Sequence, residues 1–145
     1  TSTCPGDYHG RLAACLGYSL AGTRACELLD ATTWLMAEDC APQPDLALKI
    51  DPECGGQSRE DGIYSAGAPE LVVEISHTTS TRDSGIKLRL YERSGVREYL
   101  IVRPEQKQVI WRELAEGKYR EIAPGAYGIF LSRVFPSLWL DPAHL

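Results

Sequence analysis

The chain has 145 residues, of which 43% are hydrophobic and 24% charged, and its formal net charge is −5 at pH 7. This composition is ordinary for a globular protein with one buried core, so we expect a single domain over residues 1–145. The negative charge argues against broad, sequence-independent binding to nucleic acid, which depends on cations that neutralise phosphates. It does not exclude a nuclease, because a bound metal ion supplies positive charge locally.

No apolar run approaches the roughly 18 residues that span a membrane, so no membrane association is expected. The first ten residues lack the pattern of a signal peptide and an initiator methionine, so we expect an N-terminal segment to be missing. The five cysteines all lie in the first 54 residues and form no CxxC. Their odd number and spacing favour reduced structural thiols over a zinc site or disulfides, and this predicts a cytoplasmic protein.

The first half of the chain predicts one helix followed by short strands. Apolar residues recur at helical spacing over residues 8–21, which indicates an amphipathic helix. Residues 24–37 lack a helical period and predict one or two strands with Asp30 at the turn. Residues 44–50 (PDLALKI) predict a short strand. The polar, glycine-rich stretch 51–67 predicts a long loop, of a length more often functional or mobile than structural.

The second half predicts a strand, a helix and then a run of strands. Residues 71–76 form an apolar strand, and a helix should begin at Ser80 or Thr81 and end near Ser94, before Gly95. Further strands are predicted over residues 97–102, 108–114 and 118–122, the last two as an antiparallel hairpin. In the tail, the predicted packing residues are Phe135, Leu138 and Trp139. This order predicts an α/β or α+β layer with a central mixed β-sheet flanked by helices.

Two acids occupy positions where burial is expected. Asp45 follows Pro44 at the start of a short strand, and Glu74 lies within the apolar strand at 71–76. A buried carboxylate requires a cation, a hydrogen-bond network or a metal ion. If the two strands are neighbours, both acids face one end of the sheet, and hard oxygen ligands of this kind suit Mg²⁺ or Mn²⁺. The alternative is that Glu74 pairs with a surface lysine and Asp45 is a turn residue.

Lys87 lies thirteen residues after Glu74, on the predicted helix. It follows Asp83 by four positions, which is the spacing of an exposed ion pair worth only a few tenths of a kcal/mol. It also precedes Tyr91 by four positions, so it borders the face expected to be buried. From that border Lys87 could reach the end of the sheet.

An acid after proline, a glutamate ending an apolar strand and a nearby lysine are the pattern of the PD-(D/E)XK nucleases. More specifically, the chain resembles the Uma-type family, which is assigned to restriction endonucleases and otherwise classed as a domain of unknown function. The matching segments cover most of residues 43–143: QPDLALKIDPECGGQSREDG, GAPELVVEIS, DSGIKLRLYERSGVREYLIV and FPSLWLDPA. The resemblance implies a restriction-endonuclease-like α/β fold with a C-terminal antiparallel hairpin.

The resemblance also implies roles for individual residues. Asp45 and Glu74 would be catalytic acids that bind the metal, with the carbonyl of Ile75 as a further ligand. Ser76 stands where the superfamily usually has its lysine, and the family's usual replacement is a lysine on the next helix, which matches Lys87.

Three further residues are candidate accessory positions, and two features of the chain differ from the family. Candidate accessory residues are Ser76, Asp83 and His9, which matches a histidine common on the family's first helix. Many relatives carry an aspartate before the proline where this chain has Arg103, and relatives usually have an N-terminal segment ahead of the first helix.

The implied function is a metal-dependent endonuclease that hydrolyses phosphodiester bonds of nucleic acid, with DNA as the expected substrate and Mg²⁺ or Mn²⁺ as cofactor. The alternative is a catalytically retired nuclease fold that acts as a binding module or assembles as a homodimer through its sheet edge. The acidic charge, Ser76 and the short N-terminus favour this alternative.

Overall fold

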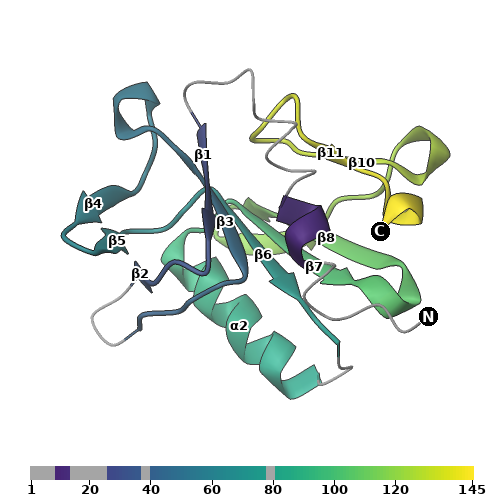
Figure 1. The fold of residues 1–145 in the computed structure, drawn as a ribbon, viewed down its shortest axis with the longest axis horizontal. Helices are drawn as coiled ribbons and strands as arrows, with labels where there is room; N and C mark the ends of the chain where they lie inside the picture. Colours follow the sequence, from purple (N-terminus) through teal and green to yellow (C-terminus); the bar gives the residue numbers. More distant parts are fainter. Residues whose placement is uncertain (1–8, 14–25, 37–39, 78–80) are drawn as a thin grey trace.

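A computed structural model of the chain describes residues 9–13, 26–36, 40–77 and 81–145, without the side chains of 81–84. At its centre lies a six-stranded mixed sheet in the order β1-β3-β6-β7-β8-β9 (Figure 1). These strands are β1 (Cys26–Asp30), β3 (Leu46–Ile50), β6 (Leu71–Ile75), β7 (Glu98–Arg103), β8 (Gln108–Ala115) and β9 (Lys118–Glu121). The predicted central mixed sheet is therefore confirmed, and β8 and β9 form the predicted hairpin.

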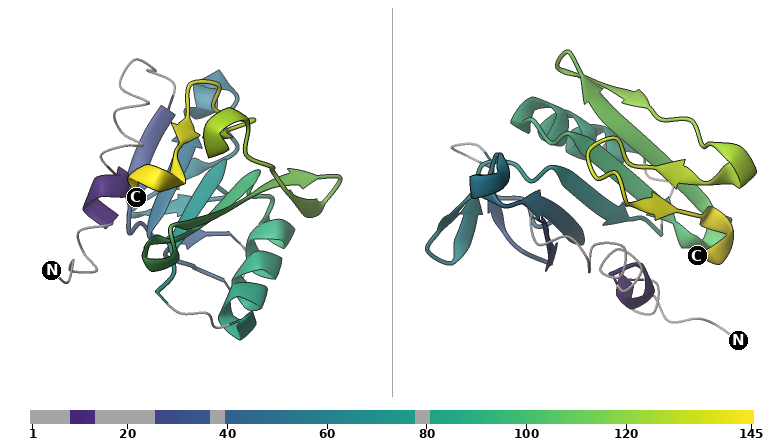
Figure 2. Two further views of the ribbon diagram at one scale, coloured as in Figure 1. Left: turned by 90° about the vertical axis from the view of Figure 1, so that its right-hand side faces the viewer. Right: turned by 90° about the horizontal axis from the view of Figure 1, so that it is seen from above.

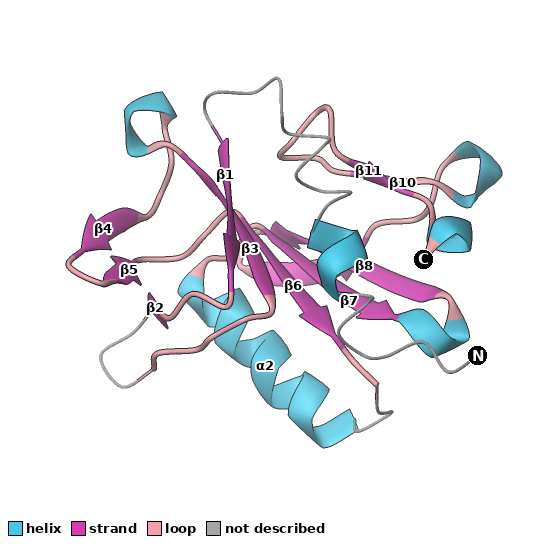
Figure 3. Cartoon of the chain, in the orientation of Figure 1, coloured by secondary structure: helices cyan, strands magenta, loops and turns pink. Residues whose placement is uncertain are grey.

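One pair of neighbouring strands in this sheet, β6 and β7, runs parallel, and the other pairs are antiparallel. Parallel strands need a crossover connection, which here is the helix α2 (Thr81–Ser94). It is the one long helix among the described residues (Figure 3). Its bounds agree with the helix predicted from the sequence.

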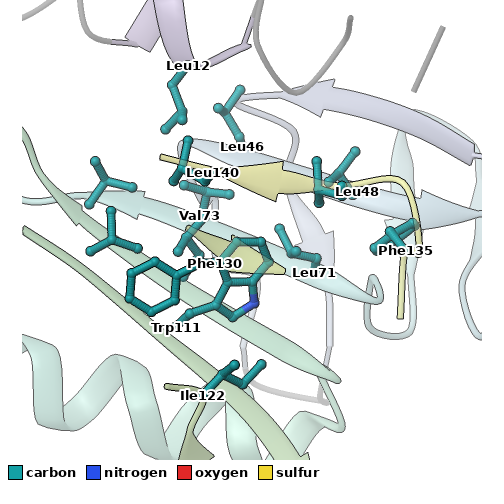
Figure 4. Close-up of a cluster of buried hydrophobic side chains, with 14 residues drawn as sticks. Leu12, Leu46, Leu48, Leu71, Val73, Trp111, Ile122, Phe130, Phe135 and Leu140 are labelled. Atoms are coloured by element: carbon teal, nitrogen blue, oxygen red, sulfur yellow. The ribbon is translucent and has the colours of Figure 1, made fainter. Parts of the chain in front are cut away.

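The sheet has a different cover on each of its two faces (Figure 2). Because side chains alternate along a strand, Val72 and Ile101 point toward α2, where they pack with Tyr91 and Tyr99. On the other face the helical segment 9–13 and the C-terminal segment cover a larger cluster of buried residues (Figure 4). The members labelled there are Leu12, Leu46, Leu48, Leu71, Val73, Trp111, Ile122, Phe130, Phe135 and Leu140. The predicted helix over 8–21 is described only for residues 9–13 and is helical there.

Two small sheets flank the central one. The first has the order β2-β5-β4, formed by β2 (Trp34–Leu35), β5 (Tyr64–Ala66) and β4 (Arg59–Asp61). The prediction of a loop over 51–67 is therefore wrong. This stretch contains a 3-10 helix at Pro52–Cys54 and the β4–β5 hairpin, whose strands of three residues are too short for alternation to be recognised.

The second small sheet pairs β10 (Phe130–Leu131) with β11 (Trp139–Leu140). Phe130 and Leu140 point into the core, so their neighbours Leu131 and Trp139 point outward. Trp139 is 54% exposed, which contradicts its prediction as a packing residue, whereas Phe135 and Leu138 are buried as predicted. The alternation of a strand, not recognised in the tail, explains the difference.

Two fully buried glutamates connect segments that are distant in the sequence. Glu70 accepts hydrogen bonds from the backbone N–H groups of Ile50 and Gln57. Glu98 accepts from Trp111 Nε1 and from the C-terminal segment: Ser132 Oγ and the N–H groups of Arg133 and Val134. Both oxygens of each carboxylate therefore accept hydrogen bonds from the protein, and these bonds hold distant segments of the fold together.

Candidate active site at one end of the sheet

The register of β3 and β6 brings Asp45 and Glu74 to the same end of the sheet. Leu46 pairs with Val73 in antiparallel register, so Asp45, immediately before β3, lies opposite Glu74, near the end of β6. Leu46 and Val73 both point into the large cluster, so alternation directs Asp45 and Glu74 to the face covered by α2. We call this side of the sheet the α2 face.

Glu74 is held by two side chains from α2. Its Oε1 accepts a hydrogen bond from Tyr91 Oη at 2.6 Å, and its Oε2 accepts one from Lys87 Nζ at 2.9 Å. Lys87 and Tyr91 are four residues apart, so they lie on one side of the helix, one turn from each other. The side chain of Glu74 is 9% exposed and that of Lys87 is 49% exposed. The ion pair therefore extends from the buried end of β6 to the protein surface.

Burial raises the pKa of Glu74 above its ordinary value. The hydrogen bonds from Tyr91 and Lys87 and the charge of Lys87 act in the opposite direction, and the nearby charge of Asp45 raises the pKa further. Burial and the Glu74 carboxylate also raise the pKa of Tyr91, so its phenol keeps its proton and remains a donor.

Asp45 is fixed to the end of β6 by its own side chain. Its Oδ2 accepts a hydrogen bond from the backbone N–H of Ile75 at 2.7 Å. Its carbonyl accepts from the N–H of Ala31, after β1. Its other carboxylate oxygen accepts no hydrogen bond from the described residues and keeps its lone pairs for another partner.

The structure brings Asp45, Glu74, Ile75 and Lys87 together at this end of the sheet, and of the accessory candidates it places His9 away from them. Ser76 follows β6, where its backbone N–H donates to the carbonyl of Val102. His9 lies on the opposite face, with Nε2 at 2.9 Å from Asp30 Oδ1, within ion-pair distance but without the geometry of a hydrogen bond. The side chain of Asp83 lies outside the described residues.

A model of the Uma2 family, described as "Putative restriction endonuclease", matches residues 4–143. The chain belongs to the Uma2 family. A crystal structure of a protein described as a putative nuclease belonging to DUF820, from Anabaena variabilis, has a similar fold. The two structures superpose with a TM-score of 0.73 at 14% sequence identity. The match covers 99% of the chain described here and 80% of the Anabaena chain. No curated protein gave a significant match.

Tyr91 contacts the candidate site, although no role was predicted for it from the sequence. Its position four residues after Lys87 was the available signal, because a helix places both on one side. Its hydroxyl is the buried donor that partly offsets the effect of burial on the Glu74 carboxylate. In the part of the chain that the structure describes, none of the helices has the length and hydrophobicity of a membrane-spanning segment.

Removing the Tyr91 hydroxyl is expected to destabilise the protein at neutral pH. In Tyr91→Phe the ionised Glu74 loses a buried donor, and hydrogen bonds to charged groups contribute about 1.5–3 kcal/mol. The pKa of Glu74 should rise further, so the deficit should shrink as the pH falls and the carboxyl is protonated. Urea unfolding at several pH values measures this, with Tyr64→Phe, a half-exposed tyrosine, as control. Equal stability of Tyr91→Phe and wild type at neutral pH would contradict the expectation.

Proposed function

We propose that this chain is a metal-dependent endonuclease that hydrolyses phosphodiester bonds of nucleic acid, with DNA as substrate. Asp45, Glu74 and the carbonyl of Ile75 would hold Mg²⁺ or Mn²⁺. The observation that carries the proposal is that Asp45 and Glu74 lie opposite each other at one end of the sheet and that Lys87 donates a hydrogen bond to Glu74. Family membership supports the same reaction class.

The donor set fits a hard divalent cation. Two carboxylates and a carbonyl supply oxygen ligands only, which Mg²⁺ and Mn²⁺ prefer. Burial, and to a smaller extent the charge of Asp45, raise the pKa of Glu74, and a cation bound between the two acids would favour the ionised form of both. Asp45 retains one oxygen without a hydrogen bond from the described residues, and each oxygen of Glu74 keeps a second lone pair beside its hydrogen bond.

The residues of the chain have separate tasks in this proposal. A divalent ion bound there would lower the pKa of a coordinated water and stabilise charge on the phosphoryl group. Tyr91 and Lys87 hold the Glu74 carboxylate in one orientation and favour its ionised form. The half-exposed ammonium of Lys87 has two further N–H donors, which can orient the attacking water or contact the scissile phosphate.

The second candidate is a retired nuclease fold that binds a partner or assembles as a homodimer through a sheet edge. In its favour, each oxygen of Glu74 already accepts a hydrogen bond from a protein side chain, Tyr91 on one and Lys87 on the other. Assembly through an edge of the central sheet would use β1 or β9, its two edge strands.

Calorimetric titration of Mn²⁺ at pH 7.5 separates the two candidates. We expect wild type to bind, and Glu74→Ala to bind at least about tenfold more weakly because it loses a charged ligand. Glu53→Ala is the matched control, since it removes an exposed acid at the opposite end of β3. No binding to wild type, or equal binding to wild type and Glu74→Ala, would favour the retired fold.

A further inference from the structure

Arg103 lies on the α2 face, one strand away from Glu74. In the parallel register of β6 and β7, Glu74 pairs with Ile101, and Arg103 is the second residue after Ile101. Ile101 points toward α2 and Val102 toward the other face, so alternation directs Arg103 toward the α2 face. The strand spacing and rise place the Cα atoms of Arg103 and Glu74 about 8 Å apart. A long side chain can span such a distance.

The guanidinium of Arg103 has donors to spare. Its Nη1 donates to Gln108 Oε1 at 3.0 Å, across the β7–β8 pair. Its Nε is buried and has no hydrogen-bond partner in the described part of the chain. Within the same part, no carboxylate lies within ion-pair distance of Arg103. A buried N–H without an acceptor is costly, and a partly buried cation favours an anionic partner.

Two other cations that the structure describes on this face each have a carboxylate within ion-pair distance. Lys87 donates to Glu74, and Arg112, also on the α2 face of the sheet, lies 3.6 Å from Glu121. Arg112 Nη1 is also buried without a hydrogen-bond partner among the described residues, but Arg112 has Glu121 within ion-pair distance. Of these three described cations, only Arg103 has unused donors and no acid of its own. Its planar fork matches two oxygens of a phosphate, which a lysine ammonium cannot do.

We infer that Arg103 binds a backbone phosphate of the nucleic-acid strand that is cut at Asp45 and Glu74. The inference rests on the proposed function and adds a substrate-binding residue to it. In a chain with a net charge of −5, an arginine at the site offsets the repulsion between the two acids and the phosphate. The competing interpretation is that Arg103 only closes the β7–β8 turn through Gln108.

The test compares Arg103→Gln and Arg103→Lys with Lys107→Gln, which removes an exposed cation from the adjoining turn. Cleavage of a fluorescein-labelled DNA duplex is measured with Mn²⁺, and binding of the same duplex by anisotropy in EDTA across a salt series. We expect Arg103→Gln to lower kcat/KM at least about tenfold and to reduce the salt slope of binding by about 1. Arg103→Lys should recover only part of the loss, and Lys107→Gln should change kcat/KM by less than about threefold.

Mn²⁺ calorimetry distinguishes failure of this inference from failure of the proposed function. Arg103→Gln should bind Mn²⁺ as wild type does, and thermal unfolding of all variants checks the fold. Wild-type cleavage by Arg103→Gln, or equal losses in Arg103→Gln and Lys107→Gln, overturns the role of Arg103 alone. If wild type neither binds Mn²⁺ nor cleaves, the proposed function fails. If duplex binding still depends on Arg103 in that case, the inferred phosphate contact stands. If it does not, both the inference and the proposed function are overturned.

Discussion

Glu74→Gln is expected to lower metal-dependent cleavage on the order of a thousandfold and to make the metal-free protein more stable at neutral pH. The rate falls because an amide is a poor metal ligand, and a divalent ion contributes several kcal/mol to the transition state. The stability rises because the burial that raises the pKa of Glu74 penalises its ionised form. The amide has nearly the same shape and keeps one oxygen for Tyr91 or Lys87.

The pH dependence follows from the direction of that pKa shift. A carboxyl whose pKa is raised in the folded protein contributes most to stability below its unfolded pKa, and this contribution is lost as the pH rises through the folded value. Wild type should therefore be less stable to unfolding than Glu74→Gln above pH 4.5, the ordinary pKa of the carboxyl, and equally stable below it. Thermal unfolding in EDTA from pH 4 to 8 measures the difference, with Glu53→Gln as control. A variant that is less stable at pH 8 would contradict this account.

Glu98→Ala is expected to destabilise the protein by about 4 kcal/mol or more. The fully buried carboxylate accepts from Trp111, Ser132 and two backbone N–H groups, and each orphaned donor costs about 1–3 kcal/mol. Its cross-strand neighbour Glu113 is the control, because that residue pairs with the largely exposed Arg120. A surface pair of that kind contributes about 0–1 kcal/mol.

Urea unfolding followed by tryptophan fluorescence measures both variants, since Trp111 reports on the environment of Glu98. The two C-terminal strands should lose their attachment first, because three of the four donors lie at Ser132, Arg133 and Val134. A loss in Glu98→Ala no larger than that in Glu113→Ala would show that the C-terminal segment is held by its apolar contacts alone.

The three buried glutamates show how far the sequence could lead. Glu70, Glu74 and Glu98 all lie in or beside apolar strands, so the argument that a buried acid requires a partner applies to each. Only the partners distinguish them: backbone N–H groups for Glu70, a tryptophan and the tail for Glu98, and a lysine with a tyrosine for Glu74. These partners are 13 to 36 residues away, beyond what a local pattern can predict.

Local patterns predicted local structure well. The apolar strand at 71–76 and the helix after it appear as β6 and α2, and the spacing of Lys87 and Tyr91 placed both on one side of that helix. The strand predicted at 44–50 begins at Leu46, so Asp45 lies just ahead of it. Asp45 lies opposite Glu74 because β3 pairs with β6. The sequence did not predict that pairing, which could only be assumed.

The single parallel pair in the central sheet has a consequence for how activity would be lost. Glu74, Lys87 and Tyr91 all belong to the continuous β6–α2–β7 unit, whereas Asp45 immediately precedes β3, whose outer neighbour β1 is an edge strand. Edges of sheets open more readily than their centres. Opening of β1 and β3 would remove Asp45 while the Glu74 network stayed intact. The protein would then become inactive before it unfolds, and hydrogen exchange would detect β1 and β3 opening ahead of β6 and β7.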